Sequence, residues 1–153
     1  MMIATRLRLL VIALWVGSLW TIGYLVAPTL FVTLADRVLA GTVAGKLFRV
    51  EAWLSVAMAL LAFALIAGSV VASRARTWVF RLIALMLGCT VIGYFGLQPM
   101  MASLREAAPG GVFSADARMQ FGILHGVASG LYLIQSVLGI VLLLKNDQLA
   151  VKQ

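Results

Sequence analysis

Four long runs without any charged residue dominate the pattern of this sequence. They cover residues 9–35, 52–73, 82–104 and 119–144, and a charged residue bounds each run on both sides. An α-helix rises about 1.5 Å per residue, so roughly 20 apolar residues cross the hydrocarbon core of a bilayer. The pattern therefore predicts an all-α membrane protein. We expect an antiparallel bundle of four transmembrane helices at about 9–33, 52–73, 82–104 and 119–144.

The segment between the first two runs has mixed polarity. Apolar residues recur there at helical spacing, with basic residues beside them: Leu39, Val43, Leu47 and Val50, next to Lys46 and Arg49. This spacing predicts a short interfacial helix between spans one and two, lying along the membrane surface. A helical extension of the second span fits the same residues equally well.

Other local signals concern bends and helix ends. Pro28 lies inside the first run, and we expect a kink there because proline removes one backbone hydrogen bond. Residues 109–111 are Pro-Gly-Gly, which predicts a break after the third span. Ser114 is then placed to cap the fourth helix, with Asp116 in its first turn.

The composition agrees with a membrane protein. Hydrophobic residues make up 63% of the chain and charged residues 11%, with a mean hydropathy of +1.09. Soluble domains carry roughly 25% charged residues, so this chain cannot build a polar shell. Barrel strands alternate apolar and polar positions, which these runs do not. Residues 1–153 are therefore interpreted as a single integral membrane domain.

The charge distribution predicts the orientation. The net charge is +7, but the basic residues lie at span ends, where they contact lipid head groups, so no nucleic-acid partner is expected. With the N-terminus inside, the cytoplasmic basic residues are Arg6, Arg8, Arg74, Arg76, Arg81, Lys145 and Lys152. By the positive-inside rule we predict a multi-pass protein of the cell inner membrane with both termini cytoplasmic.

The fourth span contains a repeated small residue. Gly122, Gly126 and Gly130 are spaced by four, and small residues at this spacing let another helix backbone approach closely. We expect this face to pack against another helix of the chain, with the third span, around Gly93, as its partner. A homodimer face is the alternative.

Polar residues in the third and fourth spans fall at matching depths. His125 and Ser129, with Tyr132, lie on one face of the fourth helix at 100° per residue. Counting inward from the charged ends places Gln98 opposite His125 and Tyr94 opposite Ser129. We therefore predict a polar cluster of these five residues, with hydrogen bonds between the two helices worth about 1 kcal/mol or less each.

A metal site is an alternative use of the same region. Met100, Met119 and His125 lie near the same end of the predicted bundle, and thioether and imidazole ligands suit Cu(I). No nucleophile–base arrangement, phosphate loop or zinc spacing is present, so we expect neither enzyme activity nor a cofactor. The acidic residues all fall outside the predicted spans, which argues against a carboxylate relay.

Short blocks of the sequence resemble a known family. Residues 14–20 (LWVGSLW), 27–31 (APTLF), 44–48 (AGKLF) and 121–125 (FGILH) are similar to blocks of the bacterial domain-of-unknown-function-4149 family. That inner-membrane family is related to the eukaryotic transmembrane protein 205. The resemblance implies a four-helix inner-membrane protein of uncharacterised activity, with a link to metal tolerance through platinum-drug resistance of the eukaryotic relatives.

Three functions follow from these observations. The first is a small membrane protein that acts through helix–helix contacts, as an oligomer or an accessory subunit. The second is a copper-type heavy-metal transport or tolerance factor. The third is a site for a lipid or small molecule between helices one and four, beside Pro28. The expected partners are membrane lipids and a second copy or another membrane protein.

Overall fold

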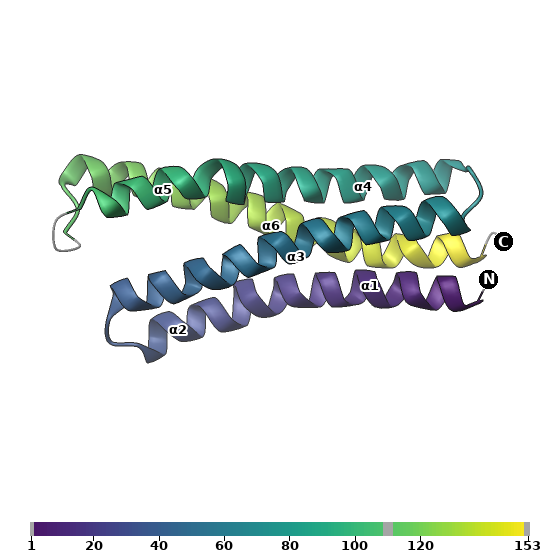
Figure 1. Ribbon diagram of the computed structural model, residues 1–153, viewed down its shortest axis with the longest axis horizontal. Helices are drawn as coiled ribbons and strands as arrows, with labels where there is room; N and C mark the ends of the chain where they lie inside the picture. Colours follow the sequence, from purple (N-terminus) through teal and green to yellow (C-terminus); the bar gives the residue numbers. More distant parts are fainter. Residues whose placement is uncertain (1, 109–111, 152–153) are drawn as a thin grey trace.

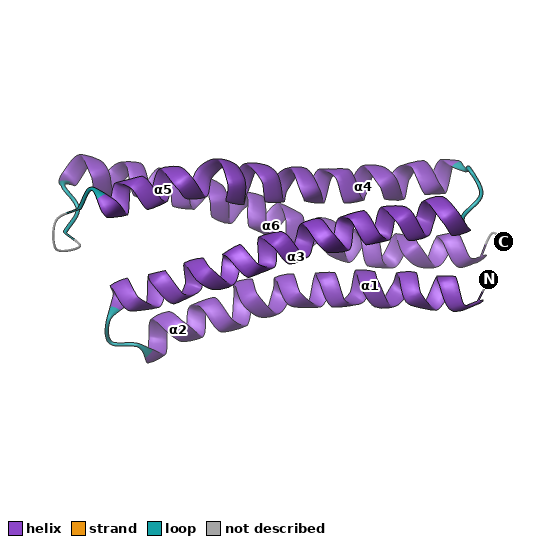
Figure 2. Ribbon diagram, viewed as in Figure 1, coloured by secondary structure: helices purple, strands orange, loops and turns teal. Residues whose placement is uncertain are grey.

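The computed structural model describes residues 2–108 and 112–151, and all regular secondary structure in this part of the chain is helical (Figure 2). Its elements are α1 (Met2–Trp20), η1 (Thr21–Val26), α2 (Ala27–Thr33), α3 (Arg37–Ser69), α4 (Arg74–Thr90), η2 (Val91–Gly96), α5 (Leu97–Glu106) and α6 (Ala115–Val151). The elements η1 and η2 are single π-helical segments. The predicted all-α fold is confirmed.

These elements form four long rods that lie side by side (Figure 1). The rods Ile3–Thr33, Arg37–Gly68, Arg74–Glu106 and Ala115–Asn146 are each long and apolar enough to cross a membrane, which indicates a multi-pass membrane protein. Each rod packs against its neighbours in sequence, and the fourth also packs against the first. Both termini lie at one end of the bundle. We call the half near the termini the terminal half and the other the distal half.

The predicted interfacial helix does not exist as a separate element. Residues 37–69 form one continuous helix, α3. Its start is fixed by the Asp36 carboxylate, which accepts the backbone N–H groups of Val38 at 2.8 Å and Leu39 at 3.1 Å. No proline interrupts the helix beyond this cap, so its hydrogen-bond ladder runs on through the mixed segment. Lys46, Arg49 and Glu51 therefore belong to the second rod.

The N-cap predicted for the fourth rod is confirmed. The Ser114 hydroxyl accepts the backbone N–H of Ala117 at 3.2 Å, and Asp116 lies in the first turn of α6. The break predicted at 109–111 falls outside the described residues.

The bend expected at Pro28 takes the form of a π-helical turn, and the third rod repeats it. Proline lacks an N–H, and its ring crowds the carbonyl four residues earlier. Pro28 follows η1 and Pro99 follows η2, so both crowded carbonyls belong to π turns. Each turn also contains the same tripeptide, Ile-Gly-Tyr, at 22–24 and 92–94. The first and third rods thus share one local design.

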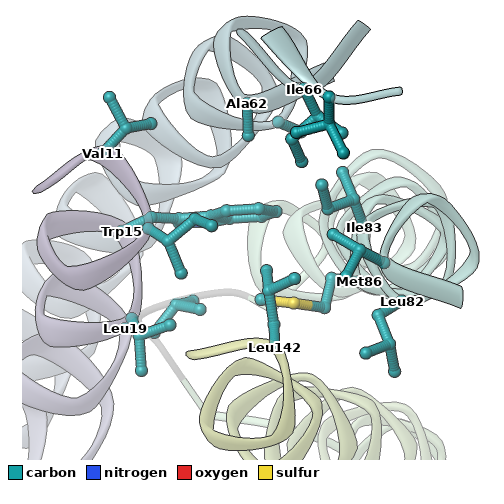
Figure 3. Packing of buried hydrophobic residues seen from close by; sticks show 14 residues of the cluster. Val11, Trp15, Leu19, Ala62, Ile66, Leu82, Ile83, Met86 and Leu142 are labelled. Atoms are coloured by element: carbon teal, nitrogen blue, oxygen red, sulfur yellow. The ribbon is translucent and has the colours of Figure 1, made fainter. Parts of the chain in front are cut away.

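The terminal half of the bundle holds the hydrophobic core. In Figure 3 the indole of Trp15 reaches from α1 toward the side chains of α4, with Leu142 of α6 beside them. Trp15, Ile83 and Met86 are completely buried. The helices approach closely at Gly139 of α6, where a Cβ would lie 3.0 Å from Val16 Cγ2. This half is therefore filled by side chains from all four rods.

We expect Gly139→Val to lower the thermal stability of the detergent-solubilised protein, because the new side chain would compete with Val16 and Met86 for space. Overpacking of this kind typically costs about 1–3 kcal/mol. Gly17→Val is the matched control, since no neighbouring atom lies within 4 Å of a Cβ at Gly17. Thermal unfolding followed by circular dichroism compares the two. Equal Tm values would show that Gly139 is not a packing contact.

Candidate functional site

The distal half encloses a cavity of about 250 Å³. Side chains from all four rods line it, including Tyr24 of η1, Glu51 of α3, Tyr94 of η2 and Tyr132 of α6. Pockets for drug-sized ligands measure roughly 300–1,000 Å³, so this one suits a small molecule or one group of a larger molecule. The site is therefore a cavity between the four rods rather than a surface patch.

Hydrogen bonds between buried polar side chains close the inner end of the cavity, toward the core. Gln135 Nε2 of α6 donates to Thr90 Oγ1 of α4 at 3.0 Å, and Trp15 Nε1 of α1 donates to Ser55 Oγ of α3 at 2.9 Å. Gln135, Thr90 and Ser55 also line the cavity. Because buried polar groups need partners, these bonds fix how the rods are turned relative to one another.

Glu51 is the most unusual group in the site. Its side chain is only 2% exposed, although it lines the cavity. Oε1 lies within hydrogen-bonding distance of two hydroxyls, 3.1 Å from Ser18 Oγ and 3.4 Å from Ser55 Oγ. Oε2 is buried and has no hydrogen-bond partner among the described residues. A buried polar atom without a partner is costly, so Oε2 is an unsatisfied acceptor in a residue that lines the cavity.

Three aromatic rings form a wall of the cavity. Phe48 meets Tyr132 edge to face at a centroid distance of 5.3 Å, and Tyr24 lies 6.2 Å from Tyr132. The Tyr132 hydroxyl donates to the backbone carbonyl of Leu19 at 2.7 Å, which fixes that ring. Aromatic faces carry partial negative charge and attract cations. We call Tyr24, Phe48 and Tyr132 the aromatic wall.

Gly23 makes the aromatic wall possible. A Cβ at this position would overlap the ring of Tyr132, so only glycine lets η1 approach α6 this closely. Gly93, the equivalent glycine of η2, has more room, since a Cβ there would meet Leu131 at 3.8 Å. Of the two Ile-Gly-Tyr sequences, the one in the first rod therefore strictly requires glycine, at Gly23, whereas the one in the third rod does not.

The comparison with protein families identifies the chain. A family model described as domain of unknown function (DUF4149) matches residues 10–109. The chain belongs to this family. The matched part includes Gly23, Tyr24, Glu51 and three of the four blocks that carried the resemblance, whereas the block at 121–125 lies beyond it. No functionally curated protein and no solved structure matched.

The polar residues predicted in this DUF4149 protein all line the cavity: His125, Gln98, Tyr94, Ser129 and Tyr132. The structure does not pair them as expected. In the described part of the chain no hydrogen bond joins Gln98 to His125 or Tyr94 to Ser129. The His125 ring instead stacks on Phe121, with centroids 6.0 Å apart. These residues therefore share the cavity lining without the two expected hydrogen bonds between the third and fourth rods, although Tyr132 does join α6 to α1 through Leu19.

The residues considered for a metal site do not converge. His125 lines the cavity, whereas Met100 and Met119 do not line it and are 53% and 62% exposed. The buried methionine at the cavity is the neighbouring Met101. Among the described residues, no three histidine, cysteine or acidic side chains form a metal-binding group.

The glycine ridge, which comprises Gly122, Gly126 and Gly130, faces open space. No neighbouring atom lies within 4 Å of a Cβ at any of the three positions. Within the described chain the ridge therefore packs against no other helix, whereas a Cβ at Gly93, its expected partner, would meet Leu131 of α6 instead. The fourth rod uses Gly139 and Tyr132 for its close contacts instead.

The sequence pattern does not single out Glu51, because this residue directly precedes the second apolar run and therefore looks like its charged boundary. The structure places it inside that rod, so the statement that the spans contain no acid is wrong for this residue. One signal was available in the sequence. Ser55 follows Glu51 by four positions, and residues at this spacing are neighbours on a helix.

We expect Gly23→Ala to destabilise the protein, because Tyr132 would have to move and release its hydrogen bond to Leu19. In a Tyr132→Ala background the same substitution should have almost no effect, giving a coupling within the roughly 0.5–3 kcal/mol typical of contacting residues. Gly93→Ala is the control and should be tolerated. Unfolding in detergent measures all four variants. Additive effects of Gly23→Ala and Tyr132→Ala would rule out the contact.

Proposed function

We propose that this protein binds a small organic cation of the ammonium class in its intramembrane cavity, without chemical conversion. The observation that carries the proposal is Glu51, a buried carboxyl group that lines the cavity and has one oxygen without a hydrogen-bond partner among the described residues. An ammonium group supplies both the hydrogen bond that Oε2 lacks and a compensating positive charge. The ligand therefore completes a site that the protein leaves half satisfied.

The aromatic wall supports this class of ligand. Tyr24, Phe48 and Tyr132 line the same cavity as Glu51, and aromatic side chains grouped around a cavity are a common way of binding ammonium ions. The rest of the lining is mainly apolar, which suits a ligand with a short hydrocarbon or aromatic body. A neutral ligand would use the apolar walls but would leave Oε2 without a strong donor.

The position of Glu51 within the membrane-spanning part supports a functional role. Ionisable residues in transmembrane segments are rare because they are costly in lipid, and they face the bundle interior or a cavity. We propose that the termini lie in the cytoplasm of a bacterial cell and that the cavity belongs to the outer half of the inner membrane. The basic loop at Arg74, Arg76 and Arg81 supports this orientation.

A second candidate is a homodimer formed through the glycine ridge. Its support is that the ridge is open to the surroundings, so the backbone of another helix could approach it. The metal-tolerance hypothesis has less support, because Met100 and Met119 lie outside the cavity that His125 lines.

We expect phenethylammonium to bind the wild-type protein in nanodiscs, and its neutral analogue 2-phenylethanol to bind more weakly. Glu51→Gln should weaken phenethylammonium binding about tenfold or more, ~1.4 kcal/mol, because the amide has no charge. Binding of 2-phenylethanol should not change. Isothermal titration calorimetry measures both ligands.

Glu106→Gln is the matched control, since Glu106 is exposed at the end of α5 and does not line the cavity. It should leave both affinities unchanged. The proposal fails if wild-type protein binds the cation no better than the alcohol, or if Glu51→Gln and Glu106→Gln behave alike.

For the second candidate, we expect chemical cross-linking in membranes to capture a dimer of the wild-type chain and much less of Gly126→Leu, whose side chain fills the ridge. Gly88→Leu is the control, because Gly88 is equally open but lies on α4. A wild-type chain that yields only monomer rules out this dimer.

A further inference from the structure

The cavity holds a second, oppositely charged group that the proposed cation site leaves unused. Arg105 lines the cavity from the last turn of α5 and belongs to the exposed part of the lining. Its guanidinium reaches across to α3, because a Cβ on Gly45 would lie 3.9 Å from Nη1. The exposed part of the cavity lining therefore includes a positive charge.

Arg105 is held in place by a ring and not by an acid. Its Cζ lies 5.0 Å from the centroid of Phe121 on α6. Among the described residues its guanidinium makes no ion pair and no hydrogen bond. A guanidinium carries five N–H donors in a planar fork that matches phosphate and carboxylate groups. Stacking on Phe121 thus positions the group while leaving its donors available.

The two charges are too far apart to neutralise each other. Gly45 and Glu51 lie six positions apart on α3, which corresponds to an offset of roughly 9 Å along the helix axis. Ion pairs require oppositely charged atoms within about 4 Å. The cavity lining therefore presents an exposed cationic group and a buried acidic group, together with the aromatic wall.

We propose that the natural ligand is a zwitterion whose ammonium group binds at Glu51 and whose phosphate or carboxylate binds Arg105. This inference rests on the proposed cation site and adds the second charge to it. Such a ligand satisfies Glu51 and Arg105 at once. The two contacts fix the orientation of the ligand in the cavity, with its anionic end toward the distal surface. The same chemistry occurs in soluble phosphoethanolamine and in the head group of phosphatidylethanolamine.

The test compares ethanolamine with O-phosphoethanolamine, two probes that differ only in the phosphate. Each competes with phenethylammonium for the wild-type protein in nanodiscs of phosphatidylglycerol. We expect O-phosphoethanolamine to compete at least tenfold more strongly than ethanolamine. Equal potency of the two probes against the wild-type protein overturns the inference without any variant.

Variants separate the two charges. Arg105→Met keeps a side chain that can pack on Phe121 but removes the charge. In this variant O-phosphoethanolamine and ethanolamine should compete with about equal potency, while phenethylammonium still binds. Arg118→Met removes an equally basic, exposed residue that does not line the cavity, and should preserve the preference. A loss of preference in both variants, or in neither, overturns the inference.

Glu51→Gln distinguishes failure of the inference from failure of the cation site. It should weaken both ethanolamine and O-phosphoethanolamine, whereas Arg105→Met should weaken only the latter. A cation site without zwitterion selectivity would show the Glu51 effect alone. An anion site without a cation site would show the Arg105 effect alone, and would overturn both proposals.

The source of the zwitterion is resolved by changing the lipid. If the head group of phosphatidylethanolamine enters the cavity, replacing phosphatidylglycerol by this lipid should weaken phenethylammonium binding to the wild-type protein at least tenfold and leave Arg105→Met nearly unaffected. If the ligand is soluble, the lipid should make no difference while the preference for O-phosphoethanolamine remains. Both results support the zwitterion and assign its origin.

Discussion

Close packing between helices is the interaction on which the rest of this structure depends. Lipid tails are as apolar as leucine, so helices in a membrane gain little from hiding apolar surface and associate through tight contact and hydrogen bonds. Here that contact is concentrated in the terminal half, where Gly139 meets Val16 and Trp15 fills the centre. Because the terminal half holds the rods together, the distal half can enclose a cavity without the bundle falling apart.

A chain of hydrogen bonds connects the packed core to the candidate site. The indole N–H of Trp15 can only donate, so Ser55 accepts that bond and directs its own proton to Glu51. The same indole is completely buried in the core. A side chain that belongs to the core therefore sets the direction of the bond made to Oε1 and leaves Oε2 as the unfilled acceptor. Stability and binding chemistry share this residue.

The sequence alone predicted the fold well and the site in part. Charge-free runs are sufficient to identify four rods. Helical periodicity predicts that His125, Ser129 and Tyr132 share one face, and all three line the cavity. It could not identify Glu51, because a charged residue beside an apolar run has the same pattern whether it ends a helix or is buried within one. The cap at Asp36 decides between these cases, and only the structure reveals it.

The spacing of small residues was also an incomplete guide. The glycine ridge has the regular spacing but no neighbour, whereas Gly23 and Gly139 make the close contacts without it. Periodicity tells which residues share a face, but not which face meets another helix.

The π turns affect more than the bend they accompany. A hydrogen bond from residue i to i+5 inserts one extra residue into the helix, so side chains beyond the turn are rotated by about 100° relative to an uninterrupted helix. Deleting one residue within 21–26 would restore a regular helix and turn Phe31 away from the cavity, although no side chain lining it had been changed. In this protein the number of residues in a π turn therefore determines which side chains line the cavity.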